Sequence, residues 1–254
     1  MKSPDVASNP DWLTARPIAH RGLHDEARGV IENSATAVRA AIDAGFGIEV
    51  DLQISADGEA MVHHDDVLGR LTEGAGRLDQ NSAAELKRVP FRGSDEHMLT
   101  LGELCDLVGR RVTMLIELKS RFDGDARLPA RVAEILTGYR GPAAPMSFDP
   151  RQVTQIRHQA PSLTCGIVAA KYHPHPYWDL MPFWMRHGMG YLVTGLAARA
   201  QFVAYGVDDL PALAPLFARA VLRLPLLTWA VRTEVERRTA ARWADQMIFE
   251  GFRP

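Results

Sequence analysis

The stretch Ile48-Glu49-Val50-Asp51-Leu52-Gln53 is the part of the chain that decides how the rest is interpreted. Apolar and polar side chains alternate along it, and this period of two is typical of a β-strand. Residues two apart on a strand share a face and lie roughly 6.5–7 Å apart, so Glu49 and Asp51 aim their carboxylates at one point. Two like charges on one face need a cation or a cationic partner, or one of them must take up a proton.

A second alternating run, residues 60–65, follows the turn Ser55-Ala56-Asp57-Gly58 and brings two histidines beside these carboxylates. Neighbouring residues on a strand point to opposite faces of the sheet. His64 is therefore expected on the side of the carboxylates, whereas His63 is interpreted as structural.

Strand and helix patterns alternate through the whole chain, which predicts a parallel sheet, and about 250 residues favours a TIM (β/α)8 barrel in a single domain. Nine strands are expected, so one of them is accessory; they cover 17–19, 48–53, 60–65, 112–119, 144–148, 163–168, 202–205, 225–231 and 247–250. The predicted helices cover 35–44, 83–87, 101–108, 130–136, 150–158, 212–221 and 234–244.

The predicted domain organisation is an N-terminal extension over 1–16 and a barrel over 17–254. Small loop insertions interrupt the barrel at about 66–100 and 172–187. The second insertion includes the aromatic stretch from Tyr172 to Trp184, which is interpreted as a hydrophobic cover over the barrel. The alternative interpretation of this stretch is a lid that touches lipid.

Composition limits the classes of protein to which the chain can belong. A hydrophobic content of 46% and a charged content of 24% are ordinary for a soluble globular protein. The formal charge of −2 gives no electrostatic reason to bind nucleic acid. Cys105 and Cys165 lack metal-ligand spacing, and no signal peptide or apolar run long enough to span a membrane is apparent. We therefore expect a cytoplasmic protein with reduced thiols.

Charged residues gather where the predicted strands end: His20 and Arg21, Glu49 and Asp51, His64 and Asp65, Glu117 and Lys119. In parallel α/β barrels these ends build the active site. Carboxylate oxygens suit a hard cation, arginine and lysine suit phosphate, and histidines suit proton transfer near neutral pH. The pattern predicts metal-assisted attack on a phosphate ester.

Five ordered motifs carry a resemblance to a known family: Ala19-His20-Arg21-Gly22, Glu32-Asn33-Ser34, Glu49-Val50-Asp51, Val62-His63-His64-Asp65 and Glu117-Leu118-Lys119. With Ser147-Phe148 and Trp229, the chain resembles the glycerophosphodiester phosphodiesterase (GDPD) family over roughly residues 17–229. The resemblance implies a TIM barrel of the PLC-like phosphodiesterase type. It also implies hydrolysis of glycerophosphodiesters to glycerol 3-phosphate and an alcohol.

The same resemblance implies roles for individual residues. One divalent cation, Mg²⁺ or Ca²⁺ with Mn²⁺ as a third possibility, would bind Glu49, Asp51 and Glu117. His20 and His64 would form the acid/base pair, Arg21 and Lys119 would bind phosphate, Glu32 would contact the substrate or metal site, and Trp229 would lie against the glycerol moiety. Ala230 and Phe249-Glu250 depart from the Thr and Thr-Asp that the family usually has there.

Two other functions remain open at this point. One is a lysophospholipase D-type activity on lysophospholipids, favoured by the Tyr172–Trp184 stretch and consistent with weak lipid contact there. The other is a non-catalytic barrel that binds phosphate esters, although the presence of both histidines and all three acids argues against it. The expected partner is a small-molecule substrate, with no nucleic acid and no transmembrane segment.

Overall fold

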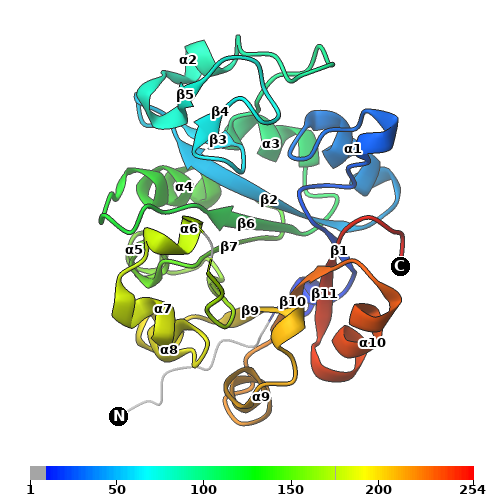
Figure 1. Ribbon diagram of the computed structural model, residues 1–254, viewed down its shortest axis with the longest axis vertical. Coiled ribbons are helices and arrows are strands. Elements are labelled where there is room, and N and C mark those ends of the chain that lie inside the picture. The colour runs from blue at the N-terminus through cyan, green and yellow to red at the C-terminus, as the bar shows by residue number, and fades with distance from the viewer. Residues whose placement is uncertain (1–9, 175) are drawn as a thin grey trace.

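Eight parallel strands close into a barrel in the computed structural model, which describes residues 10–174 and 176–254 (Figure 1). Strand β1 pairs with both β2 and β11, and this double pairing closes the ring. The predicted TIM barrel is therefore confirmed. The barrel strands are β1 (Ile18–Ala19), β2 (Gly47–Ile54), β6 (Met114–Leu118), β7 (Ala143–Ser147), β8 (Gly166–Ala169), β9 (Phe202–Gly206), β10 (Leu226–Val231) and β11 (Gln246–Phe249).

The accessory strand among the nine is the one predicted over residues 60–65. β3 (Ala60–Val62) runs antiparallel to the outer half of β2, with Leu52 opposite Val62 and Ile54 opposite Ala60. The eight-residue β2 is long enough to pair with barrel strands at its start and with this hairpin partner at its end.

The insertion after β3 has a small core of its own. It contains the two-stranded sheet of β4 (Val67–Leu68) and β5 (Gly76–Arg77) and the short helix α2 (Ala83–Leu86). Its apolar side chains pack into a separate cluster of buried residues made of Met61, Leu68, Leu78, Leu86, Phe91 and Met98. The insertion is therefore held as a unit against the edge of the barrel.

Helices cover the outside of the barrel, and the short ones lie in the loops (Figure 1). The long helices are α1 (Ala35–Asp43), α3 (Leu101–Val108), α4 (Arg127–Gly138), α5 (Pro150–Gln159), α9 (Leu213–Ala220) and α10 (Glu234–Trp243). The short helices α6 (Pro176–Asp179) and α7 (Phe183–Met189) lie in the second predicted insertion, and α8 (Val193–Ala197) follows it. No helix in the described part of the chain is long and apolar enough to cross a membrane. His175 of the predicted aromatic cover lies outside the described residues.

The strand predicted over 60–65 ends earlier, at Val62 of β3. Two predicted starts also differ from the structure by three residues, for local reasons. Helix α4 begins at Arg127 rather than at residue 130, because the Asp125 carboxylate accepts a hydrogen bond from the Arg127 amide (2.9 Å) at the polar start of the helix. Strand β8 begins at Gly166 rather than at residue 163, because the Leu163 amide bonds to Ala160 in a turn. Both differences are consistent with turn chemistry overriding the apolar pattern.

Residues 10–16, the described part of the predicted extension, pack against the end of the barrel where the strands begin. Leu13 is fully buried in the main core. The Thr113 hydroxyl donates to the Trp12 carbonyl (2.9 Å), and the Gln246 amide donates to the Thr14 carbonyl (2.8 Å). This short segment therefore covers the N-terminal face of the barrel.

Candidate active site

A cavity of about 720 Å³ opens at the C-terminal ends of the barrel strands. Side chains from the ends of β1, β2, β6 and β10, from the insertion and from α6 line it. The lining includes His20, Glu49, His64, Glu117 and Trp229. Residues far apart in the sequence are thus brought together at the end of the barrel where such folds place their active sites.

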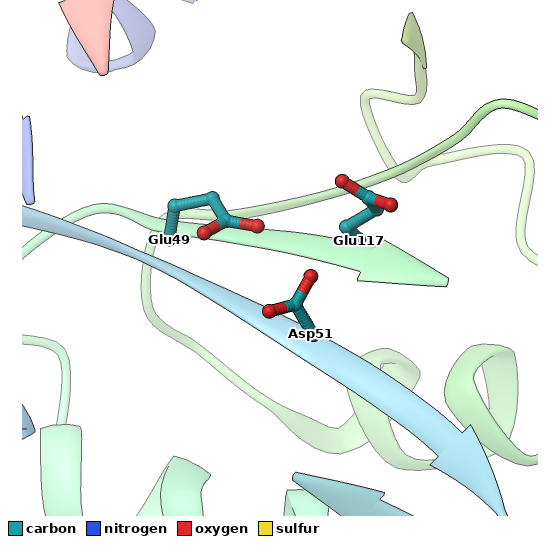
Figure 2. Close-up of side chains that lie close together, drawn as sticks. All are labelled: Glu49, Asp51 and Glu117. Atoms are coloured by element: carbon teal, nitrogen blue, oxygen red, sulfur yellow. The ribbon is translucent and has the colours of Figure 1, made fainter. Parts of the chain in front are cut away.

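Three carboxylates converge at the base of this cavity. Glu49 and Asp51 project from the same face of β2, and Glu117 lies opposite Asp51 on β6 (Figure 2). Each offers an oxygen that lies within 4.8 Å of the others, and all three residues are buried. The expectation that Glu49 and Asp51 aim at one point is confirmed.

Cationic and amide side chains surround Asp51. The Lys119 ammonium lies 2.7 Å from Asp51 Oδ1 and 2.6 Å from Glu117 Oε1. Arg21 Nε lies 3.2 Å from Asp51 Oδ2, and the Asn33 side-chain amide donates to the same oxygen (3.0 Å). Burial favours the neutral acid, but Lys119 and Arg21 outweigh it and hold the pKa of Asp51 well below its usual range.

Glu49 is in the opposite electrostatic situation. Burial, followed by the charges of Asp51 and Glu117, raises its pKa well above the usual range. Its Oε2 accepts a hydrogen bond from the Arg21 amide (3.1 Å). Its buried Oε1 has no hydrogen-bond partner among the described residues. An orphaned buried oxygen beside two further carboxylates fits a hard divalent cation that takes only oxygen ligands.

Each histidine of the predicted pair has a carboxylate at Nδ1. His20 Nδ1 lies 3.0 Å from Glu250 Oε2, and its Nε2 lies 3.8 Å from Glu49 Oε2. His64 Nδ1 lies 2.7 Å from Asp65 Oδ1. A carboxylate at Nδ1 fixes the ring and leaves Nε2 for proton exchange. Burial lowers the pKa of His20, although the hydrogen bond to Glu250 opposes this shift.

His63 points away from the site, as the alternation predicts. Its ring packs against Phe91 of the insertion, with ring centroids 6.4 Å apart. The side chain is buried, and this burial lowers its pKa to about 4. His63 is thus part of the support for the insertion rather than of the cavity lining.

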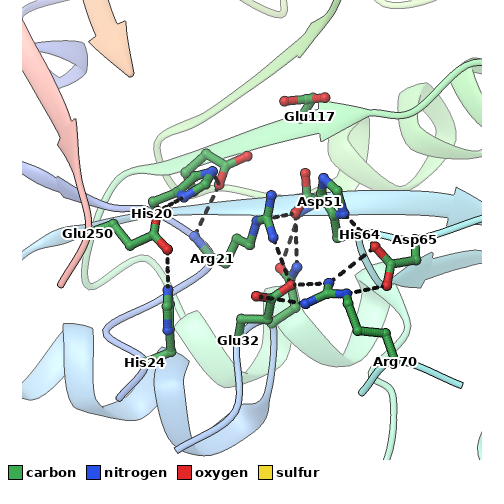
Figure 3. A network of polar contacts seen from close by, with 12 residues as sticks. His20, Arg21, His24, Glu32, Asp51, His64, Asp65, Arg70, Glu117 and Glu250 are labelled. Carbon is green, nitrogen blue, oxygen red and sulfur yellow. Dashed lines mark hydrogen bonds and ion pairs between the residues drawn. The ribbon is translucent and has the colours of Figure 1, made fainter. Parts of the chain in front are cut away.

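Glu32 links the predicted phosphate-binding arginine to the insertion (Figure 3). Its Oε1 accepts hydrogen bonds from Arg21 Nη1 (2.8 Å) and from Arg70 Nη2 (2.7 Å). Arg70 also donates to Asp65, so one arginine of the insertion contacts both acids. Arg70 lies in a glycine-rich segment without periodicity, and no signal in the sequence marks it.

Two further residues at the site are not singled out as functional by the sequence reasoning. Glu250 holds His20, and its position directly after an apolar strand is the signal that could have marked it. Asn33, part of the Glu32-Asn33-Ser34 motif, forms two hydrogen bonds with Asp51, and the neighbouring Ser34 caps α1. Asn33 adopts a positive φ of 58°, which turns its side chain back toward β2.

An aromatic wall forms the apolar side of the cavity. The Phe148 ring packs edge-to-face against Trp229 (centroids 5.6 Å apart) and against Trp178 of α6 (5.3 Å apart). Leu180 also lines the cavity and is 40% exposed. The predicted neighbour of the glycerol moiety, Trp229, is therefore one member of an apolar surface that reaches the outside.

The chain also matches known proteins along almost all of its length. The model of the family described as "Glycerophosphoryl diester phosphodiesterase family" matches residues 20–252. The chain belongs to this family. The resemblance inferred from the five motifs is thereby confirmed, and the family membership covers every element of the barrel from β2 to β11.

Curated relatives in the family match this chain over part of their length. A glycerophosphodiester phosphodiesterase of Caldanaerobacter subterraneus subsp. tengcongensis is 27% identical over 161 residues, which cover 59% of this chain and 65% of that protein. Glycerophosphodiester phosphodiesterase 1 of Mus musculus is 28% identical over 116 residues, which cover 42% of this chain and 34% of that protein. The matches thus span less than two thirds of these relatives.

Solved structures with the same fold match a larger share of this chain than the curated relatives do. A phosphodiesterase from Oleispira antarctica, in complex with the product sn-glycerol-3-phosphate, superposes with a TM-score of 0.74 at 19% identity over 93% of this chain and 94% of that one. A glycerophosphodiester phosphodiesterase from Thermotoga maritima superposes with a TM-score of 0.67 at 21% identity over 91% and 92%. At these identities the likeness shows the fold.

Proposed function

We propose that this protein hydrolyses glycerophosphodiesters to glycerol 3-phosphate and an alcohol, with a divalent cation and two histidines. The observation that carries the proposal is the convergence of three buried carboxylates within 4.8 Å beside two histidines, each with a carboxylate at Nδ1. Family membership supports it, as does the glycerol 3-phosphate product bound by the Oleispira antarctica phosphodiesterase.

In this proposal the carboxylates of Glu49, Asp51 and Glu117 hold the cation, which supplies positive charge against the phosphate. Mg²⁺ or Ca²⁺ suits the all-oxygen ligand set best, and Mn²⁺ is a third candidate. Arg21 and Lys119 bind the phosphate oxygens. Both already lie against the acids of the cation site, so phosphate binds where positive charge from two side chains is concentrated.

His20 and His64 move the protons in this reaction. One accepts a proton from the attacking oxygen and the other donates a proton to the leaving oxygen. They follow different strands, β1 and β3, and both line the cavity. Glu250 and Asp65 hold the two rings at Nδ1, so that Nε2 is the atom that exchanges the proton.

The experiment is hydrolysis of glycerophosphocholine with and without EDTA, followed by enzymatic detection of glycerol 3-phosphate. Activity should disappear with EDTA and return with Mg²⁺, Ca²⁺ or Mn²⁺. His20→Ala and His64→Ala should each lower kcat by about 10²–10⁴-fold, whereas His63→Ala should retain activity. Binding of glycerol 3-phosphate without turnover of any diester would instead support the non-catalytic barrel.

A lysophospholipase D-type activity is the second candidate, and the aromatic wall favours it. Trp178 and Leu180 line the cavity, and Leu180 is 40% exposed. An acyl chain could lie along this surface while the phosphate occupies the polar site. Trp178→Ser should then lower turnover of lysophosphatidylcholine more than that of glycerophosphocholine. Equal losses on both substrates would exclude a lipid-specific role.

A further inference from the structure

Arg70 is the one residue of the insertion's glycine-rich loop that reaches two acids of the active site, and the proposed function gives it no role. We propose that Arg70 is a positioning residue that aligns His64 through Asp65 and Arg21 through Glu32. This inference depends on the proposed roles of His64 in proton transfer and Arg21 in phosphate binding.

The contacts form one continuous network with Arg70 in the middle (Figure 3). Arg70 Nε donates to Asp65 Oδ2 (2.6 Å), and Arg70 Nη2 donates to Asp65 Oδ1 (3.1 Å). The same Nη2 donates to Glu32 Oε1 (2.7 Å). Asp65 Oδ1 in turn contacts His64 Nδ1 (2.7 Å), and Glu32 Oε1 accepts from Arg21 Nη1 (2.8 Å). Each acid therefore stands between Arg70 and a residue that faces the cavity.

The planar guanidinium explains why an arginine is required at this position. Two carboxylates that share one site repel each other, and a forked cation with several fixed donors can hold both at defined angles. Arg70 and its neighbours lower the pKa values of Glu32 and Asp65, which keeps both acids charged and able to accept hydrogen bonds. Without Arg70, Glu32 would keep its contact with Arg21 and Asp65 its contact with His64, but both acids would lose the donor that joins them.

The effect should appear in catalysis rather than in stability. The Arg70 side chain is 47% exposed, and ion pairs at that level of exposure contribute about 0–1 kcal/mol to folding. In contrast, removal of a residue that orients an active-site group through a hydrogen bond typically changes activity by about 10–100-fold. Arg70 is thus expected to matter through the rings and charges that it aligns.

The test compares Arg70→Ala with Arg131→Ala by steady-state kinetics on glycerophosphocholine and by thermal melting. Arg131 is a matched control, because it also bridges two acids, Glu59 (2.9 Å) and Glu134 (2.8 Å), but lies outside the cavity. Arg70→Ala should lower kcat/KM by about 10–100-fold, with a lower kcat and a higher KM. Arg131→Ala should match the wild type. Equal losses in both variants, or none in Arg70→Ala, would overturn the proposal.

A double-mutant cycle separates alignment from general support of the loop. Asp65→Asn removes only the path to His64, so it should lower kcat and leave KM close to that of the wild type. In that background Arg70→Ala should lower kcat no further but should still raise KM through Glu32 and Arg21. A full additional loss of kcat would refute the path through Asp65.

Two further variants test the charge of Arg70 and the acid/base role of His64 separately. Arg70→Lys keeps the charge but loses the fork, so it should recover part of the lost kcat/KM; no recovery in a folded protein would contradict the role of the charge. His64→Ala is measured in the same series. If His64→Ala keeps full activity, the proposed acid/base role fails. If His64→Ala is inactive while Arg70→Ala is normal, only the positioning role fails.

Discussion

Binding of the cation should release a proton from this protein, and Glu49 is the source. In the absence of a cation, burial and the charges of Asp51 and Glu117 raise the pKa of Glu49 well above its usual range. A cation ligand must be deprotonated, so the ion binds only the charged carboxylate. Metal binding and loss of the Glu49 proton are therefore one coupled event.

The size of the effect follows from the number of groups that are shifted upward. Asp51 is held in its charged form by Lys119 and Arg21, so Glu49 is the principal proton carrier of the two acids on β2. The release should approach about one proton per ion at pH values below the raised pKa of Glu49. Affinity should rise by up to about tenfold per pH unit in that range and level off above it.

Isothermal titration calorimetry of Mg²⁺ into chelated protein, in buffers with different ionisation enthalpies, measures this release directly. The slope of observed heat against buffer enthalpy gives the number of protons. Glu49→Gln is the control, because it cannot ionise, and it should bind the ion more weakly and without proton release. A wild-type slope of zero together with a Kd that does not depend on pH would refute the assignment of Glu49.

Three further outcomes follow from other parts of the structure. His63 has a pKa of about 4 in the folded protein against about 6.5 in the unfolded chain. Its contribution to stability is therefore complete above pH 6.5 and is lost as the pH falls toward 4. In urea unfolding, His63→Asn should show about 3 kcal/mol less acid destabilisation than the wild type. Glu250→Gln should lower kcat by about 10–100-fold with little change in melting temperature, because Glu250 holds the ring of His20. The hydrogen bond to His20 is also the main cause that lowers the pKa of Glu250 to about 2. An unchanged kcat would contradict this role. Leu13→Ala should cost about 2–5 kcal/mol in urea unfolding, because Leu13 is fully buried under the barrel, whereas a loss below 1 kcal/mol would show that the segment contributes little to the core.

The parts of the fold and site that depend on local pattern could be predicted from the sequence. Alternation in β2 placed Glu49 and Asp51 on one face, and the same rule separated His63 from the cavity. The number of strands was sufficient to predict the barrel with one accessory strand. For Glu49 and Asp51 the period of two corresponds directly to one face of β2, whereas His63 lies just past the end of β3.

The features that could not be predicted depend on contacts between distant segments. Arg70 reaches Glu32 across 38 positions, and nothing in the composition of its loop indicates which acids it will meet. Lys119, assigned to phosphate, also pairs with Asp51 and Glu117, because the register of β2 against β6 brings these side chains together. Side-chain partners of this kind are determined by packing, which a single sequence does not reveal.

The contact between His20 and Glu250 joins positions that are 230 residues apart, at the two ends of the barrel sheet. β1 meets β11 only when the ring of strands is closed, so the ring nitrogen of His20 has this carboxylate only in the closed barrel. Under the proposed function, the rate of turnover would then report whether β1 and β11 are paired. On the same proposal, a chain with β11 detached would lack the Glu250 contact and should therefore turn over at least about 10–100-fold more slowly.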